Sequence, residues 1–337
     1  MMRRAILFND TRIDRHHGCS SVIESIIRLC ARHEIELIHK LPAHSPWQDD
    51  RDLPGLMARA DLVIVNGEGS IHHDRPAGKR LLQVAQYARA QGCASALINT
   101  TWARNSADLA RLAAGFDLVS LRESASRDEL AAHGIACRVI PDLALYTKPP
   151  APRPRHGILV TDNVVAGQSL ALHHRLNTQG ARPLSLLWGR RDPLNVLRNL
   201  RRYRLDPKAR KMGWGTALSA ALDDWRAQTK DRDAFLRQLV GAELVVTGRF
   251  HALILCLATD TPVIALPSNT HKNRATLHDA GLAPWRAPED VEQIDTVLLQ
   301  RARNWQEQEA PALTNWRAGG CAAMEQLFAD LARLAPR

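Results

Sequence analysis

The stretch ELVVTGRFHALILCLATDTPVIALPSNTHKN, residues 243–273, decides the fold of the second half of the chain. Its first six residues are a short apolar run that ends in turn formers, which predicts a buried strand over 243–248. A helical pattern follows at 249–259 and a second strand at 261–268. This strand, helix, strand order indicates a parallel sheet with a crossover helix. Arg249 and His251 stand where the first strand passes into the helix.

The same alternation runs through the rest of the chain. Short apolar runs predict strands at 5–10, 35–40, 61–67, 93–100, 117–123 and 137–142, then at 157–163, 183–189, 243–248 and 261–268. Helical patterns occur at 20–33, 78–92, 106–115, 216–228, 231–240, 249–259 and 271–281. The predicted fold class is therefore α/β, with two doubly wound, Rossmann-like lobes.

A proline-rich stretch marks the predicted domain boundary. The segment KPPAPRPR, residues 148–155, holds four prolines and predicts a stiff, extended linker. We therefore expect a first lobe over 1–150, a second lobe over 156–288, and an amphipathic helical tail over 289–337 that packs on the lobes. Lobes of this type bind ligands in a cleft between the carboxyl ends of their strands, so the residues that follow the strands are the functional candidates.

Composition narrows the class of protein. The chain has 337 residues, of which 45% are hydrophobic, and its formal net charge is +10. This charge favours an anionic partner, and because no nucleic-acid motif accompanies it, we expect no nucleic acid. The six cysteines form no C-x-x-C pair, which is typical of reduced thiols. No apolar run of about 18 residues and no signal peptide is found, so we expect a cytoplasmic location.

The most basic segment is RRDPLNVLRNLRRYRLDPKARKMGW, residues 190–214. Arginines alternate there with leucine and tyrosine, as in an amphipathic element that docks on a surface. Two interpretations stay open. The segment is either a solvated basic helix and loop, or a peripheral contact with anionic lipid headgroups or a lipid-linked acceptor at the inner face of a membrane. The oligomeric state stays open as well.

The third strand of the first lobe is followed by GEGSIHHDRPAGK, residues 67–79. The candidate residues in this turn are Gly67, Glu68, Ser70 and His72. A carboxylate beside imidazoles suits acid–base chemistry or the orientation of sugar hydroxyls, whereas the alternative is a glycine turn with solvated polar groups. The turn matches neither the dinucleotide fingerprint nor a P-loop. We expect no metal site, because the adjacent His72 and His73 would point apart.

Other strand ends of the first lobe supply further candidates, namely Asn9, Asp10, Asn99, Trp102, Arg122 and Asp142. Asn99 offers hydrogen bonds, and Trp102 offers either an aromatic surface or packing. Arg122 could bind an anion or tie a turn through Glu123. Asp142 could accept a proton from a sugar or form a Pro-Asp turn.

Arg249 and His251 combine a planar cation with a group that titrates near neutral pH. At the amino end of a helix both lie where the helix dipole favours an anion, although the same residues could cap and solvate the helix. The next strand is followed by Ser268, Asn269 and Lys272, which add a second cation. The sequence therefore predicts a site for an anionic donor in the second lobe.

Together these stretches resemble the polysaccharide pyruvyl transferase family. The similarity rests on VVTGRFHALILCLATDTPVIALPSNTHKN with DLVIVNGEGSIHH, LVSLRESAS and VIPDLAL in the same order, and covers about residues 5–285. Members are similar in architecture to two-lobed B-type glycosyltransferases (GT-B). They transfer the enolpyruvyl unit of phosphoenolpyruvate to a sugar of a surface or cell-wall glycan precursor, and form a pyruvate ketal and phosphate.

The resemblance implies residue roles and no cofactor. Arg249, Lys272 and Arg122 would bind the donor, with Ser268 and Asn269 nearby, and His251 would protonate its methylene carbon. Glu68 or Asp142 would take the proton of the acceptor hydroxyl. The acceptor, a glycan or lipid-linked sugar, would lie against Asn9, Asp10, Gly67, Ser70, His72, Asn99 and Trp102.

One feature departs from the family pattern. Many members have a run of glycines where this chain has GEGSIHH, so the acceptor and the ketal reaction itself stay open. The alternatives are a GT-B glycosyltransferase that uses a nucleotide-activated sugar, for which Trp285, Glu289 and Asp290 offer weak support, and a non-enzymatic binding or scaffold protein.

Overall fold

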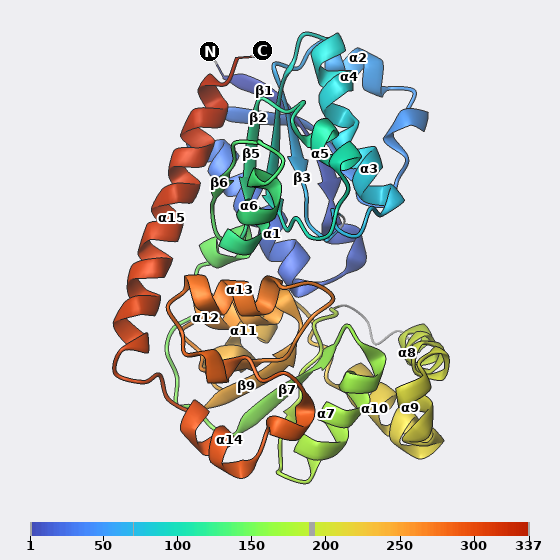
Figure 1. The fold of residues 1–337 in the computed structure, drawn as a ribbon, viewed down its shortest axis with the longest axis vertical. Helices are drawn as coiled ribbons and strands as arrows, with labels where there is room; N and C mark the ends of the chain where they lie inside the picture. Colours follow the sequence, from blue (N-terminus) through green and yellow to red (C-terminus); the bar gives the residue numbers. More distant parts are fainter. Residues whose placement is uncertain (1, 70, 189–192, 336–337) are drawn as a thin grey trace. The chain divides into compact units, whose positions relative to one another are not determined.

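The computed structural model describes residues 2–69, 71–188 and 193–335, and these form two compact units (Figure 1). The first unit comprises Met1–Asp14, Val22–Tyr146 and Ala318–Arg337, and the second comprises Arg15–Ser21 and Thr147–Arg317. The change of unit at residue 147 adjoins the proline-rich segment 148–155. Two features of this division are not visible in the sequence pattern: a short N-terminal segment belongs to the second unit, and residues 289–337 are divided between the units.

The first unit contains a six-stranded, fully parallel sheet in the order β2-β1-β3-β4-β5-β6. Its strands are β1 (Arg3–Asp10), β2 (Ile35–Pro42), β3 (Leu62–Asn66), β4 (Ala94–Thr100), β5 (Leu118–Leu121) and β6 (Arg138–Val139). Its α-helices are α1 (His17–Arg32, whose first turn lies in the second unit), α2 (Leu53–Met57), α3 (Pro76–Leu82), α4 (Val84–Ala90), α5 (Ala107–Ala113) and α6 (Ser124–Ala131).

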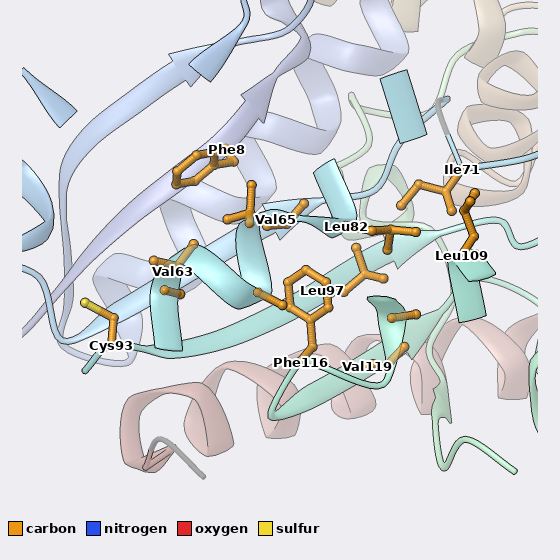
Figure 2. Packing of buried hydrophobic residues seen from close by; sticks show 14 of the residues in the cluster. Phe8, Val63, Val65, Ile71, Leu82, Cys93, Leu97, Leu109, Phe116 and Val119 are labelled. Atoms are coloured by element: carbon orange, nitrogen blue, oxygen red, sulfur yellow. The ribbon is translucent and has the colours of Figure 1, made fainter. Parts of the chain in front are cut away.

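Helices pack on this sheet, so the central strands are buried along their whole length. Every residue of β3 and β4 is buried, which explains why their sequences are mostly apolar rather than alternating, with polar residues mainly at their carboxyl ends. Figure 2 shows part of the core, in which Phe8, Val65 and Leu97 of the sheet pack with Phe116 and residues of α3 and α5.

The second unit contains a four-stranded parallel sheet in the order β10-β9-β7-β8. Its strands are β7 (Ile158–Asn163), β8 (Arg182–Pro183), β9 (Leu244–Gly248) and β10 (Val263–Ala265). Its α-helices are α7 (Ala166–Asn177), α8 (Leu194–Leu205), α9 (Pro207–Lys211), α10 (Trp214–Arg226), α11 (Arg232–Val240), α12 (Phe250–Ala258), α13 (Lys272–Asp279), α14 (Thr296–Ala302) and the first part of α15 (Glu309–Arg333). Across the described ranges, no helix is long and apolar enough to span a bilayer.

The α/β class and the parallel arrangement predicted from the sequence are confirmed, with local corrections. Of the predicted strand 183–189 only Pro183 lies in β8, and residue 189 lies outside the described residues. Leu184 N still donates to Val160 O at 2.8 Å, but Leu187 and Trp188 then bridge to His16 and Thr229 instead of to β7. The predicted helix 78–92 is α3 followed by α4, and Gln83 keeps a helical backbone between them. Helix α7 is not predicted, because its opening glycine lowers helix propensity; tertiary packing selects that glycine, since a Cβ at Gly167 would lie 2.7 Å from Cβ of Lys208.

Candidate functional site

Parallel strands of the second unit bring Asp162 and Arg249 to the same edge of the sheet. Asn163 at the end of β7 is in register with Gly248 at the end of β9. Arg249 follows β9 and its Nε donates to Oδ1 of Asp162 at 2.7 Å, while its Nη2 donates to Oδ2. The backbone N–H of Arg249 is held by Oγ1 of Thr247 at 2.9 Å. A bidentate pair of this kind fixes the plane of the guanidinium as well as its position.

A second guanidinium shares the same carboxylate. Nη1 of Arg202, from α8, lies 3.1 Å from Oδ2 of Asp162, and its Nη2 donates to the carbonyl oxygen of Asn163. Burial by itself would raise the pKa of Asp162, but Arg249 and then Arg202 bring that pKa below its ordinary value. One carboxylate therefore serves two cations, and these three side chains together keep one excess positive charge.

Asp224 of α10 adds a titratable group to this cluster. Burial, and then the charge of Asp162, raises the pKa of Asp224 to about 6, although hydrogen bonds from Ser185 and Asn199 act in the opposite direction. Nδ2 of Asn199 donates to Oδ2 of Asp224 at 3.1 Å. The charge near Arg249 therefore changes in the mildly acidic range.

His251 lies in the first turn of α12 and contacts a second imidazole, that of His16. The two ring centroids are 5.4 Å apart, and the rings are inclined by 60°. Nδ1 of His16 accepts a hydrogen bond from the backbone N–H of Gly18 at 3.1 Å. Burial, and then the charges of His251 and Arg249, lower the pKa of His16 well below its ordinary value, so His16 is neutral at physiological pH.

Gly18 is required by close approach to His251. A Cβ added at Gly18 would lie only 2.1 Å from Cβ of His251. The segment that carries Gly18 is held in the second unit by backbone bonds, because His17 N donates to Leu186 O and Trp188 N donates to Arg15 O, both at 2.9 Å.

In the described ranges, one group of side chains could hold a metal ion. Ligand atoms of His16, Cys19 and His251 all lie within 4.8 Å of one another. This set was not foreseen, since the sequence predicted no metal site. Because Nδ1 of His16 already accepts from Gly18, the proton of this neutral ring is on Nε2, and that nitrogen would have to lose it before it could bind a metal.

The loop after β10 places Lys272 beside the start of α12. Nζ of Lys272 donates to Oδ1 of Asn269 at 2.8 Å and lies 5.8 Å from the ring centroid of Phe250. Ser268 Oγ donates to the same amide oxygen at 3.2 Å. The predicted donor residues other than Arg122 thus all belong to the second unit.

The predicted acid–base residue of the first unit, Glu68, lies in a buried polar network. Its Oε2 accepts from Thr11 Oγ1 at 2.8 Å and from Asn66 Nδ2 at 3.3 Å, and Nδ2 of Asn9 donates to the Asn66 carbonyl oxygen at 2.6 Å. Asn9 and Asn99, at the ends of β1 and β4, have φ of 67° and 58°. Non-glycine residues adopt this left-handed region only under constraint, which marks these strand ends as functional candidates.

Arg122 and Asp142 form a closed ion pair in the first unit. Nη1 of Arg122 lies 2.8 Å from Oδ2 of Asp142, and the two side chains are 2% and 0% exposed. The remaining carboxylate oxygen accepts from Ala144 N at 2.9 Å, and Arg122 also donates to Thr101. Donor binding by Arg122 and proton transfer by Asp142 would require this pair to open, and both roles stay predictions.

The remaining acceptor candidates are placed as follows. Trp102 is fully buried in the core, so of its two expected roles the structure shows packing. His72 and His73 converge rather than point apart: their Nδ1 atoms are 2.8 Å apart, because the φ of 56° at His73 turns its ring back. Asp10 is bound to Arg12. Ser70 lies outside the described residues.

Gly67 is confined by contact, not by its backbone angles. A Cβ at Gly67 would lie 1.7 Å from Oγ1 of Thr100, whereas Gly69, with φ of 74°, has the left-handed conformation that glycine favours. Of the two glycines in this turn, only Gly69 therefore uses the backbone freedom of glycine.

Three residues of the second-unit site were missed in the sequence. Asp162 is the next-to-last residue of the run GILVTDN, so a search for polar residues at strand ends could have found it. Arg202 is one of seven arginines in the basic segment 190–214, and nothing in the sequence distinguishes it from the other six. His16 follows the first predicted strand, in the range expected for the first lobe, but its segment belongs to the second unit.

The fold defines an α/β protein of GT-B-like architecture. UDP-GlcNAc 2-epimerase from Methanocaldococcus jannaschii aligns with a TM-score of 0.53 and 14% identity over 97% of this chain and 99% of that one. An α,α-trehalose-phosphate synthase (UDP-forming) from Burkholderia vietnamiensis aligns with a TM-score of 0.52 and 10% identity over 98% and 99%.

Sequence comparison then identifies the family. The model of polysaccharide pyruvyl transferases matches residues 8–270, so the chain belongs to the polysaccharide pyruvyl transferase family, a family of transferases. No curated protein matches the chain in a sequence search.

Proposed function

We propose that the protein transfers the enolpyruvyl group of phosphoenolpyruvate to a sugar of a surface-polysaccharide or cell-wall glycan precursor, and forms a pyruvate ketal and phosphate in the cytoplasm. One observation carries this proposal: Asp162 holds the guanidinium of Arg249 in one plane, with His251 two residues further along at the start of α12. A fixed guanidinium suits the carboxylate and phosphate of this donor. Membership of the family supports the same reaction.

In this reaction Arg249 binds an anionic group of the donor. Its Nη1 makes no hydrogen bond to any of the residues that the structure describes, while Nε and Nη2 are held by Asp162. Arg202 and Lys272 add positive charge to the same unit. Fixed cations of this kind stabilise the charge that develops as phosphate leaves.

His251 as an imidazolium gives its proton to the methylene carbon of the donor, which leaves an oxocarbenium-like centre. The first acceptor hydroxyl adds to that centre, and its proton passes to a carboxylate, for which Glu68 is our candidate. Phosphate then leaves and regenerates an oxocarbenium-like centre, the second hydroxyl adds to it, and its proton is taken up by the departing phosphate, which closes the ketal. The scheme uses no cofactor.

The direct test is to incubate the purified protein with phosphoenolpyruvate and candidate sugar-lipid acceptors and to measure phosphate release. We expect acceptor-dependent release, and mass spectrometry should show the acceptor heavier by one pyruvyl ketal. Transfer that occurs only with a nucleotide sugar would overturn the proposal.

A nucleotide-sugar transferase is the second candidate, and one cavity of the second unit favours it. A pocket of about 700 Å³ is lined by Trp285, Glu289 and Arg301, and neither Arg249 nor His251 lines it. Guanidiniums of Arg286 and Arg301 lie 4.5 and 4.3 Å from the Trp285 ring centroid, so this ring is not free to stack a base and the support comes from the size of the cavity alone. The two structural neighbours named above are enzymes of UDP-linked reactions.

Thermal stabilisation separates the two candidates. A ligand that binds only the folded protein adds about 2.7 kcal/mol at 100 times its Kd. We expect phosphoenolpyruvate to raise the Tm and UDP-sugars to leave it unchanged. The reverse result would favour the second candidate.

A further inference from the structure

Helix α8 has an inner face and a solvent-exposed outer face. Val196, Leu200 and Tyr203 pack into a small core with residues of α7 and α10. The opposite stripe, spaced as one helical face, consists of Leu194, Leu197, Arg198, Arg201, Arg204 and Leu205. Its three leucines are 54%, 61% and 72% exposed. Leucine and arginine share one solvent-exposed face, which is unusual for a helix that needs only to be soluble.

The same surface continues onto the next two helices, which lie beside α8 (Figure 1). Trp214 and Leu218 at the start of α10 are 65% and 45% exposed. The exposed cations of α9 are Lys208, Arg210 and Lys211. A groove of about 620 Å³ runs between the three helices, with Leu205 and Trp214 in its walls. We call the exposed residues of 194–218 the basic–apolar surface.

This surface has a large excess of positive charge. Residues 193–218 contain seven arginines and lysines and one aspartate. Arg202 turns inward to Asp162, and the six others form no ion pair with any side chain in the described ranges. Cations that the protein itself does not neutralise call for an anionic partner.

We propose that the basic–apolar surface binds the protein to a bilayer that contains anionic lipids. The leucines and Trp214 would enter the interface between headgroups and acyl chains, while the arginines and lysines bind the headgroup phosphates. A second copy of the chain fits poorly, since a two-fold interface would press the same cations against one another. Nucleic acid would leave the exposed leucines without a partner.

The docking helix also reaches the candidate site. Arg202 on the inner face of α8 binds the carboxylate that fixes Arg249. If the proposed function holds, membrane binding keeps the donor-binding unit where lipid-linked acceptors are found. The docking itself does not depend on that function.

The test measures co-sedimentation of the full chain with vesicles of phosphatidylcholine, with or without phosphatidylglycerol. We expect binding only with phosphatidylglycerol, and weaker binding as salt rises. Each basic residue near an anionic surface contributes about 1 kcal/mol, so Arg198→Gln/Arg201→Gln/Arg204→Gln should lower the partition coefficient on the order of 100-fold. The control Arg51→Gln/Arg59→Gln/Arg111→Gln removes the same charge from exposed sites of the first unit and should bind like the wild type.

A second variant tests the apolar half of the surface. Leu197→Gln/Leu205→Gln/Trp214→Gln keeps the charge, and we expect at least tenfold weaker binding. Wild-type binding by this variant, or equal losses in the two arginine triples, would overturn the proposal. Two further results would overturn it. In the first, the wild type does not bind the vesicles but forms a dimer that this variant disrupts. In the second, the wild type does not bind the vesicles but binds an oligonucleotide. Hydrogen exchange of the wild type needs no variant, and vesicles should slow exchange across 194–218.

Discussion

Each of the two sheets carries an arginine–aspartate pair at the carboxyl ends of its strands, and the two pairs differ in their access to solvent. In the first unit the side chains of Arg122 and Asp142 are 2% and 0% exposed. In the second unit those of Arg249 and Asp162 are 29% and 18% exposed, and Arg202 binds the same carboxylate. The first pair is matched in charge and closed, whereas the second keeps an excess cation within reach of solvent.

This difference separates a pair that supports the fold from one that can bind a ligand. A buried pair without access to solvent has its donors and acceptors used within the protein, so it stabilises its surroundings and offers little to a substrate. A partly exposed guanidinium whose plane is already fixed loses little entropy when an anion binds. By this reasoning the second unit holds the donor site.

The sharpest test of the comparison removes one arginine from each pair. Arg122→Met leaves Asp142 buried without its cation, so we expect the free energy of unfolding to fall by roughly 3–5 kcal/mol. Arg249→Met leaves Asp162 paired with Arg202, so we expect a loss of roughly 1–2 kcal/mol. Urea denaturation of both variants measures the difference.

A double variant controls for lost packing at Arg122. Arg122→Met/Asp142→Leu removes both charges and should recover most of the lost stability. Equal destabilisation by the two single arginine variants would show that the pairs do not differ in the way their exposure suggests.

Catalysis should depend most on His251. If it is the proton donor, His251→Gln lowers kcat by about 10²–10⁴-fold with little change in the KM for phosphoenolpyruvate. Arg249→Lys keeps the charge but loses the planar fork, so it should mainly raise that KM. Steady-state phosphate release measures both parameters, and the assignment fails if the two variants exchange effects.

The contact of Gly18 with His251 predicts a smaller effect. In Gly18→Ala the new Cβ would overlap Cβ of His251, so the ring or the backbone has to move. We expect a loss of about 1–3 kcal/mol in stability and on the order of 10²-fold in kcat/KM. Gly55→Ala is the matched control, because a Cβ there meets no atom within 4 Å. A Gly18→Ala variant as active as Gly55→Ala would remove this segment from the site.

Most of the fold could be predicted from the sequence because buried parallel strands leave a strong local signal. Runs such as DLVIVNG and CASALINT are mostly apolar without a strict alternation, and both form central strands. Helix α7 lacks such a signal: its sequence AGQSLALHHRLN has a poor helix former, Gly167, in the first turn, and packing against α9 decides its structure. Local pattern fails where tertiary contact selects the residue.

The site was less predictable, because the sequence does not show which side chains contact one another. Arg249 and His251 were found because they follow a strand. The closing of Arg122 onto Asp142 joins residues 20 positions apart, and the approach of His16 to His251 joins residues 235 positions apart. No spacing rule links such residues, so their partners could be named only from the structure.

Asp224 offers the mildest test, through pH. Burial and the charge of Asp162 raise its pKa in the folded protein to about 6, above the value expected in the unfolded chain. The folded state therefore binds this proton more tightly, and the free energy of unfolding falls as pH rises from about 4 to above 6. Asp224→Asn removes that loss, so its Tm should exceed that of the wild type by roughly 2–4 °C near neutral pH and match it near pH 4.

Asp223→Asn is the matched control. Asp223 is the neighbour of Asp224 in the chain, but its own carboxylate pairs with His173 and Arg226. We expect it to give no such rise in Tm. If Asp224→Asn lowers the Tm at every pH, its hydrogen bond from Asn199 outweighs the cost of its charge. The carboxylates around Arg249 would then have their hydrogen-bonding needs met within the protein, as Asp142 does. The difference between the two arginine–aspartate pairs would rest only on the second cation, Arg202.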